Sequence, residues 1–320
     1  MALRLEILLE HALQNFGSPI NITGSSYQLP LAWLLARPQL QKFQQRPHLV
    51  IVPSDEIATE LYDNICSLNP NASLYRLHAF DVSPYSQLDP NHSIIGERLR
   101  WLNAAYESKP SCIFIASIDA LLQKTLPVST FLQLRFHLET NNLLPDGLKT
   151  RLLTMGYQQV PLVEDIGQFS RRGDILDIFS PALNKPVRIE LFGDSIEAIK
   201  TFEPTTQRSL EPIKSVTIVP TLETIYFDED KQSLIERFRV STEGRNCDAG
   251  EVQQIQHNLL HSNYFAAVPF LLPIIPSPVS FSPRRFFVGL WIPYPSLKQP
   301  TDYDSVSTGS FKRTLKALFA

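Results

Sequence analysis

The sequence has little that would support a disulfide framework or a metal centre. Its 320 residues include only three cysteines, Cys66, Cys112 and Cys247, and none of them forms a Cys-x-x-Cys pair. An odd number of widely spaced thiols argues against a disulfide scaffold and against a zinc site, and it is typical of a reducing compartment. We therefore expect a cytoplasmic protein that holds no metal and no other cofactor.

An excess of charge of one sign is also absent. Lysine and arginine number 29, aspartate and glutamate number 32, and the formal net charge is −3 with no block of like charges. Weak acidity argues against broad nonspecific binding to nucleic acid, although a local basic patch is compatible with a near-neutral total. We expect contact with DNA to be weak or indirect.

The chain lacks a long uninterrupted apolar run. The apolar region after Phe265 is broken by four prolines, at Pro269, Pro273, Pro276 and Pro278. A membrane span is therefore not expected. At the other end, residues 3–16 place acids among leucines, which predicts an amphipathic helix rather than an export signal.

The first third of the chain alternates apolar strands with helices. The segments 48–53, 73–78 and 112–116 are apolar runs of strand length, and the helical segments 54–65 and 94–106 lie between them. This βαβ alternation predicts an α/β fold with a doubly wound parallel sheet. The length and the 43% hydrophobic content suit about two domains with a sizeable core.

A phosphate-binding loop is expected near Gly24 in such a domain, but its chemistry is missing. The loop needs a Gly-Lys-Ser/Thr run in which the lysine reaches the β- and γ-phosphates and the hydroxyl holds Mg²⁺. Ser25, Ser26 and Gln28 stand in the corresponding stretch, and Pro30 removes a backbone donor. We expect a degenerate loop that does not bind ATP.

The segment 127–213 has a different pattern, that of a small α+β insert. A helix is expected over 148–155, followed by antiparallel strands. In the run 187–192 the odd positions are apolar, so Val187, Ile189 and Leu191 belong to one face of a strand. Gly193-Asp194 then predicts a two-residue hairpin turn into 195–202.

The opposite face of that strand carries Arg188, Glu190 and Phe192. Arginine and aromatic side chains concentrate at binding hot spots, so Arg188 and Phe192 are candidates for protein–protein contact. Arg172 is a further candidate, but a bulge at Gly173 would change its face, and its orientation stays open. The alternative is an ordinary solvated strand face.

Other polar residues are weaker candidates. His78 and His92 have no carboxylate, cysteine or second histidine at a useful spacing, so structural or surface roles are expected. Glu164 and Asp165 form a possible acid pair, but nothing nearby supplies a nucleophile, a metal ligand or an oxyanion donor. A solvated loop is the expected interpretation.

Three runs carry a family resemblance: Arg172–Phe179, Pro186–Glu197 and Phe202–Leu210. Together they resemble the UvrB-homologous N-terminal module of the bacterial transcription-repair coupling factors, the Mfd family. The Thr-Gln-Arg-Ser-Leu ending of the third run is more similar to that family than to UvrB itself. The likeness extends over roughly residues 3–265.

The resemblance implies a function. The insert is expected to bind the damage-recognition ATPase UvrA, and Arg172, Arg188 and Phe192 match the family's contact positions. The module is expected to be a UvrB-like fold with a decayed nucleotide site at Gly24, Ser25 and Ser26, and to have no catalytic residue. The polymerase-contacting domain and the helicase-like motor of the family are not expected within this chain, so it is interpreted as a truncated, non-enzymatic adaptor of nucleotide excision repair.

We therefore expect four segments. Residues 1–126 begin the UvrB-like α/β domain, 127–213 form the insert that binds UvrA, 214–268 return to the α/β domain, and 269–320 form an atypical proline-rich tail. The tail is expected to be frameshifted, disordered or divergent. Two alternatives to the adaptor remain open: a relic or weak ATP-dependent helicase-type repair protein, and a nonfunctional truncated product.

Overall fold

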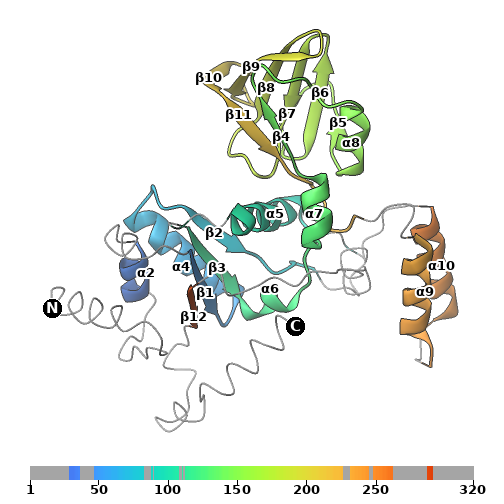
Figure 1. Ribbon diagram of the computed structural model, residues 1–320. Helices are drawn as coiled ribbons and strands as arrows, with labels where there is room; N and C mark the ends of the chain where they lie inside the picture. The colour runs from blue at the N-terminus through green and yellow to red at the C-terminus, as the bar shows by residue number, and fades with distance from the viewer. Residues whose placement is uncertain are drawn as a thin grey trace. The chain divides into compact units, whose positions relative to one another are not determined.

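The computed structural model describes residues 29–36, 47–82, 88, 90–107, 110, 112–225, 231–244, 248–261 and 287–290. Within these ranges the chain has a mixed α/β structure (Figure 1). The described residues fall into two compact units. The first is drawn from Met1–Leu77, Glu107–Leu122 and Ser282–Ala320, and the second from His78–Tyr106 and Gln123–Phe281.

The first unit is built on a four-stranded sheet with the order β12-β1-β3-β2. Its strands are β1 (His48–Val52), β2 (Leu74–Leu77), β3 (Ile113–Ser117) and β12 (Phe287–Leu290). Every neighbouring pair is parallel. The three apolar runs in the first third of the sequence are therefore parallel strands, as the βαβ pattern predicts.

Two helices cover one face of this sheet. Helix α4 (Asp55–Leu68) begins after Ser54, whose hydroxyl oxygen accepts a hydrogen bond from the Ile57 amide and so caps the helix N-terminus. Helix α2 (Leu29–Leu35) packs against α4, and the short helix α6 (Ile118–Leu122) follows β3. The buried side chains between the helices and the sheet come from α2 and the residue after it, α4, β1 and β3: Ala32, Ala36, Val50, Val52, Ala58, Leu61, Ile65, Ile113 and Ile115.

Strand β12 lies within residues 269–320, the proline-rich tail for which the sequence analysis predicts no strand. Residues Phe287–Leu290 pair in parallel with β1, His48 lying opposite Phe287. Four consecutive residues are too few to show a period, and their pairing partner lies more than two hundred positions away. The rest of the tail, the expected helix over 3–16 and the loop residues Gly24, Ser25 and Ser26 lie outside the described residues.

The second unit contains a six-stranded sheet with the order β10-β9-β8-β7-β6-β5. Its strands are β5 (Gln158–Gln159), β6 (Gln168–Arg172), β7 (Ile175–Ile178), β8 (Val187–Phe192), β9 (Ser195–Phe202) and β10 (Ser209–Ile213). All neighbours are antiparallel except β5 and β6. The expected antiparallel sheet is confirmed, and helix α8 (Leu148–Thr154) forms within the expected range 148–155.

A two-stranded sheet completes this domain. Strand β4 (Phe136–Glu139) pairs in antiparallel fashion with β11 (Ser215–Ile218). The sequence analysis assigns residues 214–268 to the segment that returns to the α/β domain; in the structure β11 pairs with β4 within the second unit. Alternation shows that a strand exists, whereas its partner is set by side chains distant in sequence, here those buried with Phe136 and Ile218.

An extended apolar core runs through the second unit. It joins the inner side chains of the six-stranded sheet, including Phe169, Ile178 and Ile189, to helix α5 (His92–Glu107) and helix α7 (Val128–Leu134). Within it Arg98 of α5 and Glu223 form a fully buried ion pair, and the Arg98 guanidinium also lies 4.2 Å from the centre of the Phe80 ring. Burial raises the pKa of Glu223. The pair ties α5 to the chain segment that follows β11.

Helices α9 (Lys231–Thr242) and α10 (Ala249–Leu260) pack against each other through Leu234, Phe238 and Leu259. Residues 226–230, directly before α9, lie outside the described part. None of the described helices has an apolar stretch of the length needed to cross a bilayer.

Gly156, two residues after the end of α8, gives a test of the packing in the second unit. Its φ is +90°, and an added Cβ would lie 2.4 Å from Leu222 Cγ. Gly147 also has a positive φ, +64°, but has nothing within 4 Å of that position. We expect Gly156→Ala to lower the free energy of unfolding by about 3 kcal/mol, since backbone strain and overpacking add, and Gly147→Ala by about 1 kcal/mol. Urea unfolding measures the free energy of unfolding of both variants. Equal decreases for Gly156→Ala and Gly147→Ala would contradict the clash with Leu222.

His48, the first residue of β1, gives a pH test of the first unit. Burial lowers its pKa from 6.5 to about 4. Because the folded state resists protonation, stability is complete above pH 6.5 and falls as the pH drops toward 4. The linkage amounts to about 2 kcal/mol between pH 7.5 and pH 5. Urea unfolding at both pH values measures this effect. Between pH 7.5 and pH 5 the free energy of unfolding should fall less for His48→Gln than for the unmodified chain. Identical decreases would contradict the lowered pKa of His48.

Candidate protein-binding site

The β8–β9 hairpin forms as its alternation predicts. Val187, Ile189 and Leu191 are buried at 0%, 0% and 5% exposure, and their side chains join the core. Gly193 has a φ of +62°, a conformation that glycine adopts without strain, and it leads the two-residue turn into β9. The pairing shifts by one residue between Glu190 and Leu191, so β9 carries a bulge. Because the odd positions of β8 face the core, its even positions are on the other side of the sheet.

That outer side has a buried carboxylate at its centre. Asp177 on β7 lies directly opposite Arg188 on β8 and is only 1% exposed. Arg188 Nε donates to Asp177 Oδ1 at 2.8 Å, and Arg188 Nη2 donates to Oδ2 at 2.9 Å. This is the two-pronged geometry that makes arginine–carboxylate pairs strong. Asp177 is part of the resembling sequence run but was not singled out as a site residue.

Arg172 shares this outer side, which settles the orientation that the sequence left open. Ser170 of β6 lies opposite Asp177, and Arg172 lies opposite Ile175. Alternation therefore places Arg172 and Asp177 on the same side of the sheet. Arg172 Nη2 donates to Asp177 Oδ2 at 3.1 Å, while half of the Arg172 side chain stays exposed. Both predicted arginines thus converge on one carboxylate.

Arg188 is more enclosed than the sequence suggests. Its side chain is only 14% exposed, and its guanidinium lies 4.7 Å from the centre of the Phe202 ring. Arg188 Nη1 also donates to the Gln207 carbonyl oxygen at 3.1 Å. The hydrogen bond to Asp177 raises the pKa of Arg188, so its charge is permanent. Strand alternation is right about the side of the sheet but does not show that a turn closes over it.

The turn that closes over Arg188 is held by Gln207. Gln207 has a φ of +59°, and its side-chain amide donates to the carbonyl oxygens of Val163 and Pro204 at 3.0 and 2.7 Å. Val163, Phe179 and Phe202 form a small apolar cluster on this side of the sheet. The Asp177–Arg188 pair is therefore a structural element beneath the surface, with only its Arg172 edge open.

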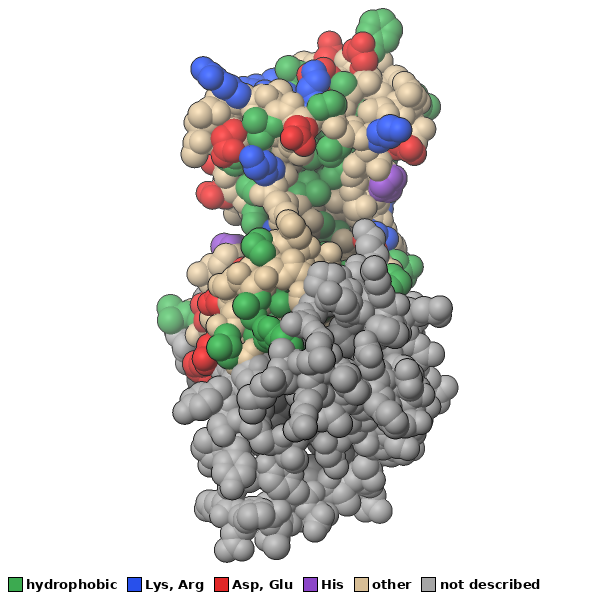
Figure 2. All heavy atoms as spheres, turned by 90° about the vertical axis from the view of Figure 1, so that its left-hand side faces the viewer, with side chains coloured by type: hydrophobic (Ala, Val, Ile, Leu, Met, Phe, Trp, Pro, Cys, Tyr) green, Lys and Arg blue, Asp and Glu red, His purple; other side chains and the backbone are tan. Residues whose placement is uncertain are grey.

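Phe192 is the most exposed of the predicted residues. Its side chain is 81% exposed at the end of the hairpin. Near it on the same side of the sheet are Ile175, 37% exposed, and the ion pair of Glu190 with Lys200 at 2.7 Å. We name the accessible side chains of Arg172, Ile175, Glu190, Phe192 and Lys200 the outer face. Figure 2 shows that charges of both signs are interspersed over the part of the chain that carries β4 to β11.

The outer face has the features of a protein contact surface. It combines an exposed aromatic ring, a half-exposed arginine and the Glu190–Lys200 ion pair on one side of a sheet. Aromatic and arginine side chains supply most of the free energy at such surfaces. The predicted set Arg172, Arg188 and Phe192 is brought to one side of the sheet, but only Arg172 and Phe192 are accessible.

The other polar candidates do not assemble a reactive site. The Glu164 and Asp165 carboxylates lie on an exposed loop whose amides donate to Gln168 Oε1. His78 has a carboxylate partner after all, Glu97, which corrects the sequence analysis; the two are 19 positions apart and meet because α5 packs beside the His78 backbone. Among the described residues no group of three or more histidine, cysteine or acidic side chains is placed to hold a metal.

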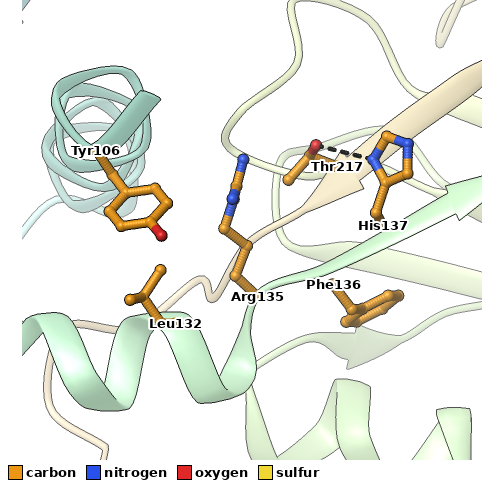
Figure 3. A pocket seen from close by; sticks show the side chains of 6 residues that line it. All are labelled: Tyr106, Leu132, Arg135, Phe136, His137 and Thr217. Carbon is orange, nitrogen blue, oxygen red and sulfur yellow. Dashed lines mark hydrogen bonds between the residues drawn. The ribbon is translucent and has the colours of Figure 1, made fainter. Parts of the chain in front are cut away.

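A cavity of about 410 Å³ lies elsewhere on this unit (Figure 3). Its lining comes from α5, α7, β4, β11 and the residue between α7 and β4: Tyr106, Leu132, Arg135, Phe136, His137 and Thr217. His137 Nδ1 and Thr217 Oγ1 are 3.3 Å apart, and Arg135 lies over the Tyr106 ring. The lining holds no carboxylate and no thiol, so it offers no acid–base pair of carboxylates and no activated cysteine.

Comparison with known proteins bears on the outer face. Residues 136–223 match the family model of the UvrB interaction domain. The chain contains a UvrB interaction domain. Its boundaries enclose β4 to β11, so the match includes the β4–β11 pair as well as the six-stranded sheet.

The relatives match more residues of the chain than the family model does. The transcription-repair-coupling factor of Myxococcus xanthus is 41% identical over 157 residues, which are 49% of this chain and 13% of that protein. The Escherichia coli factor is 28% identical over 194 residues, 60% of this chain and 16% of its own length. The Haemophilus influenzae factor is 27% identical over 263 residues, which are 79% of this chain and 23% of that protein. The chain thus spans less than a quarter of the length of these relatives, and the predicted resemblance is confirmed.

The Asp177 pair gives a stability test for the UvrB interaction domain. Arg188→Ala should lower the free energy of unfolding by about 3 kcal/mol, because it leaves a buried carboxylate with one edge contact. Arg172→Ala, which removes a half-exposed partner of the same carboxylate, should lower it by less than about 1 kcal/mol. Urea unfolding measures both, and Asp177→Asn should restore part of the stability of Arg188→Ala. Equal losses for the two arginines would show that the pair is not structural.

Proposed function

We propose that this chain is a non-catalytic adaptor of nucleotide excision repair that binds UvrA through its UvrB interaction domain. The observation that carries the proposal is the outer face, which presents Phe192 and Arg172 on the domain that matches the family model. The resemblance to transcription-repair-coupling factors supports the same conclusion. RNA polymerase contact and motor activity form no part of the proposal.

The three predicted residues have different roles in this proposal. Phe192 supplies apolar area that is exposed in the free protein and becomes buried on binding. Arg172 keeps donors free for a carboxylate of the partner, since only one of its nitrogens contacts Asp177. Arg188 acts as a positioning residue, because it holds the sheet and the Gln207 turn beneath the face.

We also propose that the first unit is a UvrB-like, doubly wound domain with a degenerate phosphate loop and no ATPase activity. Its four parallel strands and the helices α2 and α4 support the fold. The missing lysine at Gln28 supports the loss of nucleotide binding, since the phosphates lose their main cation. Partnership with UvrA in DNA repair would be cytoplasmic, and we propose that the chain contacts DNA only indirectly or weakly.

Calorimetry of the whole chain with purified UvrA tests the adaptor. We expect binding in the micromolar range or tighter, and Phe192→Ala should weaken it about thirtyfold, which corresponds to about 2 kcal/mol for the loss of a central anchor. The free energy of unfolding should not change, because the side chain is exposed in the free protein.

Val240→Ala is the matched control, since Val240 is 56% exposed on α9, outside the matched domain. It should bind as the unmodified chain does. A folded chain that does not bind UvrA would reject the adaptor and favour a relic of a helicase-type ancestor. Binding that Phe192→Ala leaves intact would place the contact surface elsewhere.

A further inference from the structure

The two most exposed large apolar side chains of the described residues lie close together. Phe192 is 81% exposed and Leu143 is 73% exposed, and no other large apolar side chain in the described part exceeds 63%. Leu143 is far from Phe192 in sequence and lies in the segment between β4 and α8. Neither the alternation nor the family resemblance singled it out.

The backbone pairing places Leu143 on the outer side of the sheet. Leu143 forms an isolated antiparallel bridge with Ser195, and Ser195 pairs with Phe192 on its other side. Hydrogen bonds from the Leu144 amide to the Asp194 carbonyl oxygen, 2.8 Å, and from the Ile196 amide to that of Asn142, 2.9 Å, flank the bridge.

Residues directly opposite one another in a sheet point to the same side. Leu143, Ser195 and Phe192 therefore form one row on the outer side. The neighbours confirm this orientation, because Leu144 and Ile196 pack into the core on the other side.

The middle residue of the row has the shortest side chain. Ser195 is the middle residue, and its short side chain stands between a leucine and a phenylalanine. Neighbouring strands are about 4.8 Å apart, so the two apolar side chains rise from backbones about 10 Å apart. A space of that width, with apolar walls and a hydroxyl at its base, accepts one aliphatic or aromatic side chain in contact with both walls.

We propose that Leu143 is a second apolar anchor for UvrA, and that UvrA inserts one apolar side chain over Ser195 between Leu143 and Phe192. The inference rests on the proposed function and names a contact residue beyond the predicted set. The row is continuous with the outer face through Phe192, and the nearby charges of Glu190 and Lys200 neutralise each other. The partner's complementary group at this point is therefore apolar.

Calorimetry with UvrA and four variants of the whole chain tests the inference. Leu143→Ala should weaken binding about tenfold, and Leu143→Met should retain the affinity because it keeps the apolar volume. Leu153→Ala is the matched control: Leu153 is 48% exposed on α8 of the same domain and should have no effect. The fourth variant, Leu143→Ala with Phe192→Ala, should bind more tightly than the product of the two single losses predicts, because both side chains contact the same inserted group.

The outcomes separate this inference from the adaptor proposal. If the unmodified chain does not bind UvrA, the adaptor proposal fails. If Phe192→Ala weakens binding and Leu143→Ala does not, only the second anchor is rejected. If the affinity loss of the double variant equals the product of the two single losses, the proposal of one shared inserted side chain is rejected. Urea unfolding of Leu143→Ala should match that of the unmodified chain, and a lower stability would assign Leu143 a folding role instead.

Discussion

The outer side of the six-stranded sheet depends on one buried carboxylate, that of Asp177. A carboxylate removed from water is costly unless charged donors replace its hydration, and Arg188 and Arg172 supply three of them. The requirement fixes the register of β6, β7 and β8. A slip of one residue would turn Asp177 into the apolar core and expose Leu176 and Ile178, which are buried at 2% and 0% exposure.

The need to neutralise Asp177 gives different roles to Arg188 and Phe192, which the sequence analysis groups together. Arg188 holds Asp177, the Phe202 ring and the Gln207 turn, so its removal disturbs the sheet before any partner arrives. Phe192 lies beyond the network, at the end of the hairpin, and its removal leaves the network intact. A loss of binding on substitution of Phe192 therefore means a lost contact, whereas a loss on substitution of Arg188 means a deformed surface. Only a measurement of stability distinguishes the two.

Local patterns made much of this fold predictable, and non-local pairing explains the remainder. Period-two alternation and the Gly193 turn predict the β8–β9 hairpin, and apolar runs predict the parallel strands. Alternation assigns Arg188 to the correct side of the sheet but does not show what covers it, because the Gln207 turn follows nineteen positions later. The same limit applies to the pairing of β11 with β4 and to the bridge between Leu143 and Ser195, because no local pattern predicts either contact.

The exposure of Phe192 and Leu143 is the strongest physical argument for a partner on this surface. Neither side chain buries enough area in the free chain to contribute much to folding, and each leaves apolar surface in water at an unfavourable free energy. Single exposed apolar residues are ordinary, but the two most exposed of the described part share one row of three. Stability alone would be served as well by polar residues at both positions. Their presence is accounted for when a partner covers the row, since burial then converts the same apolar area into binding free energy.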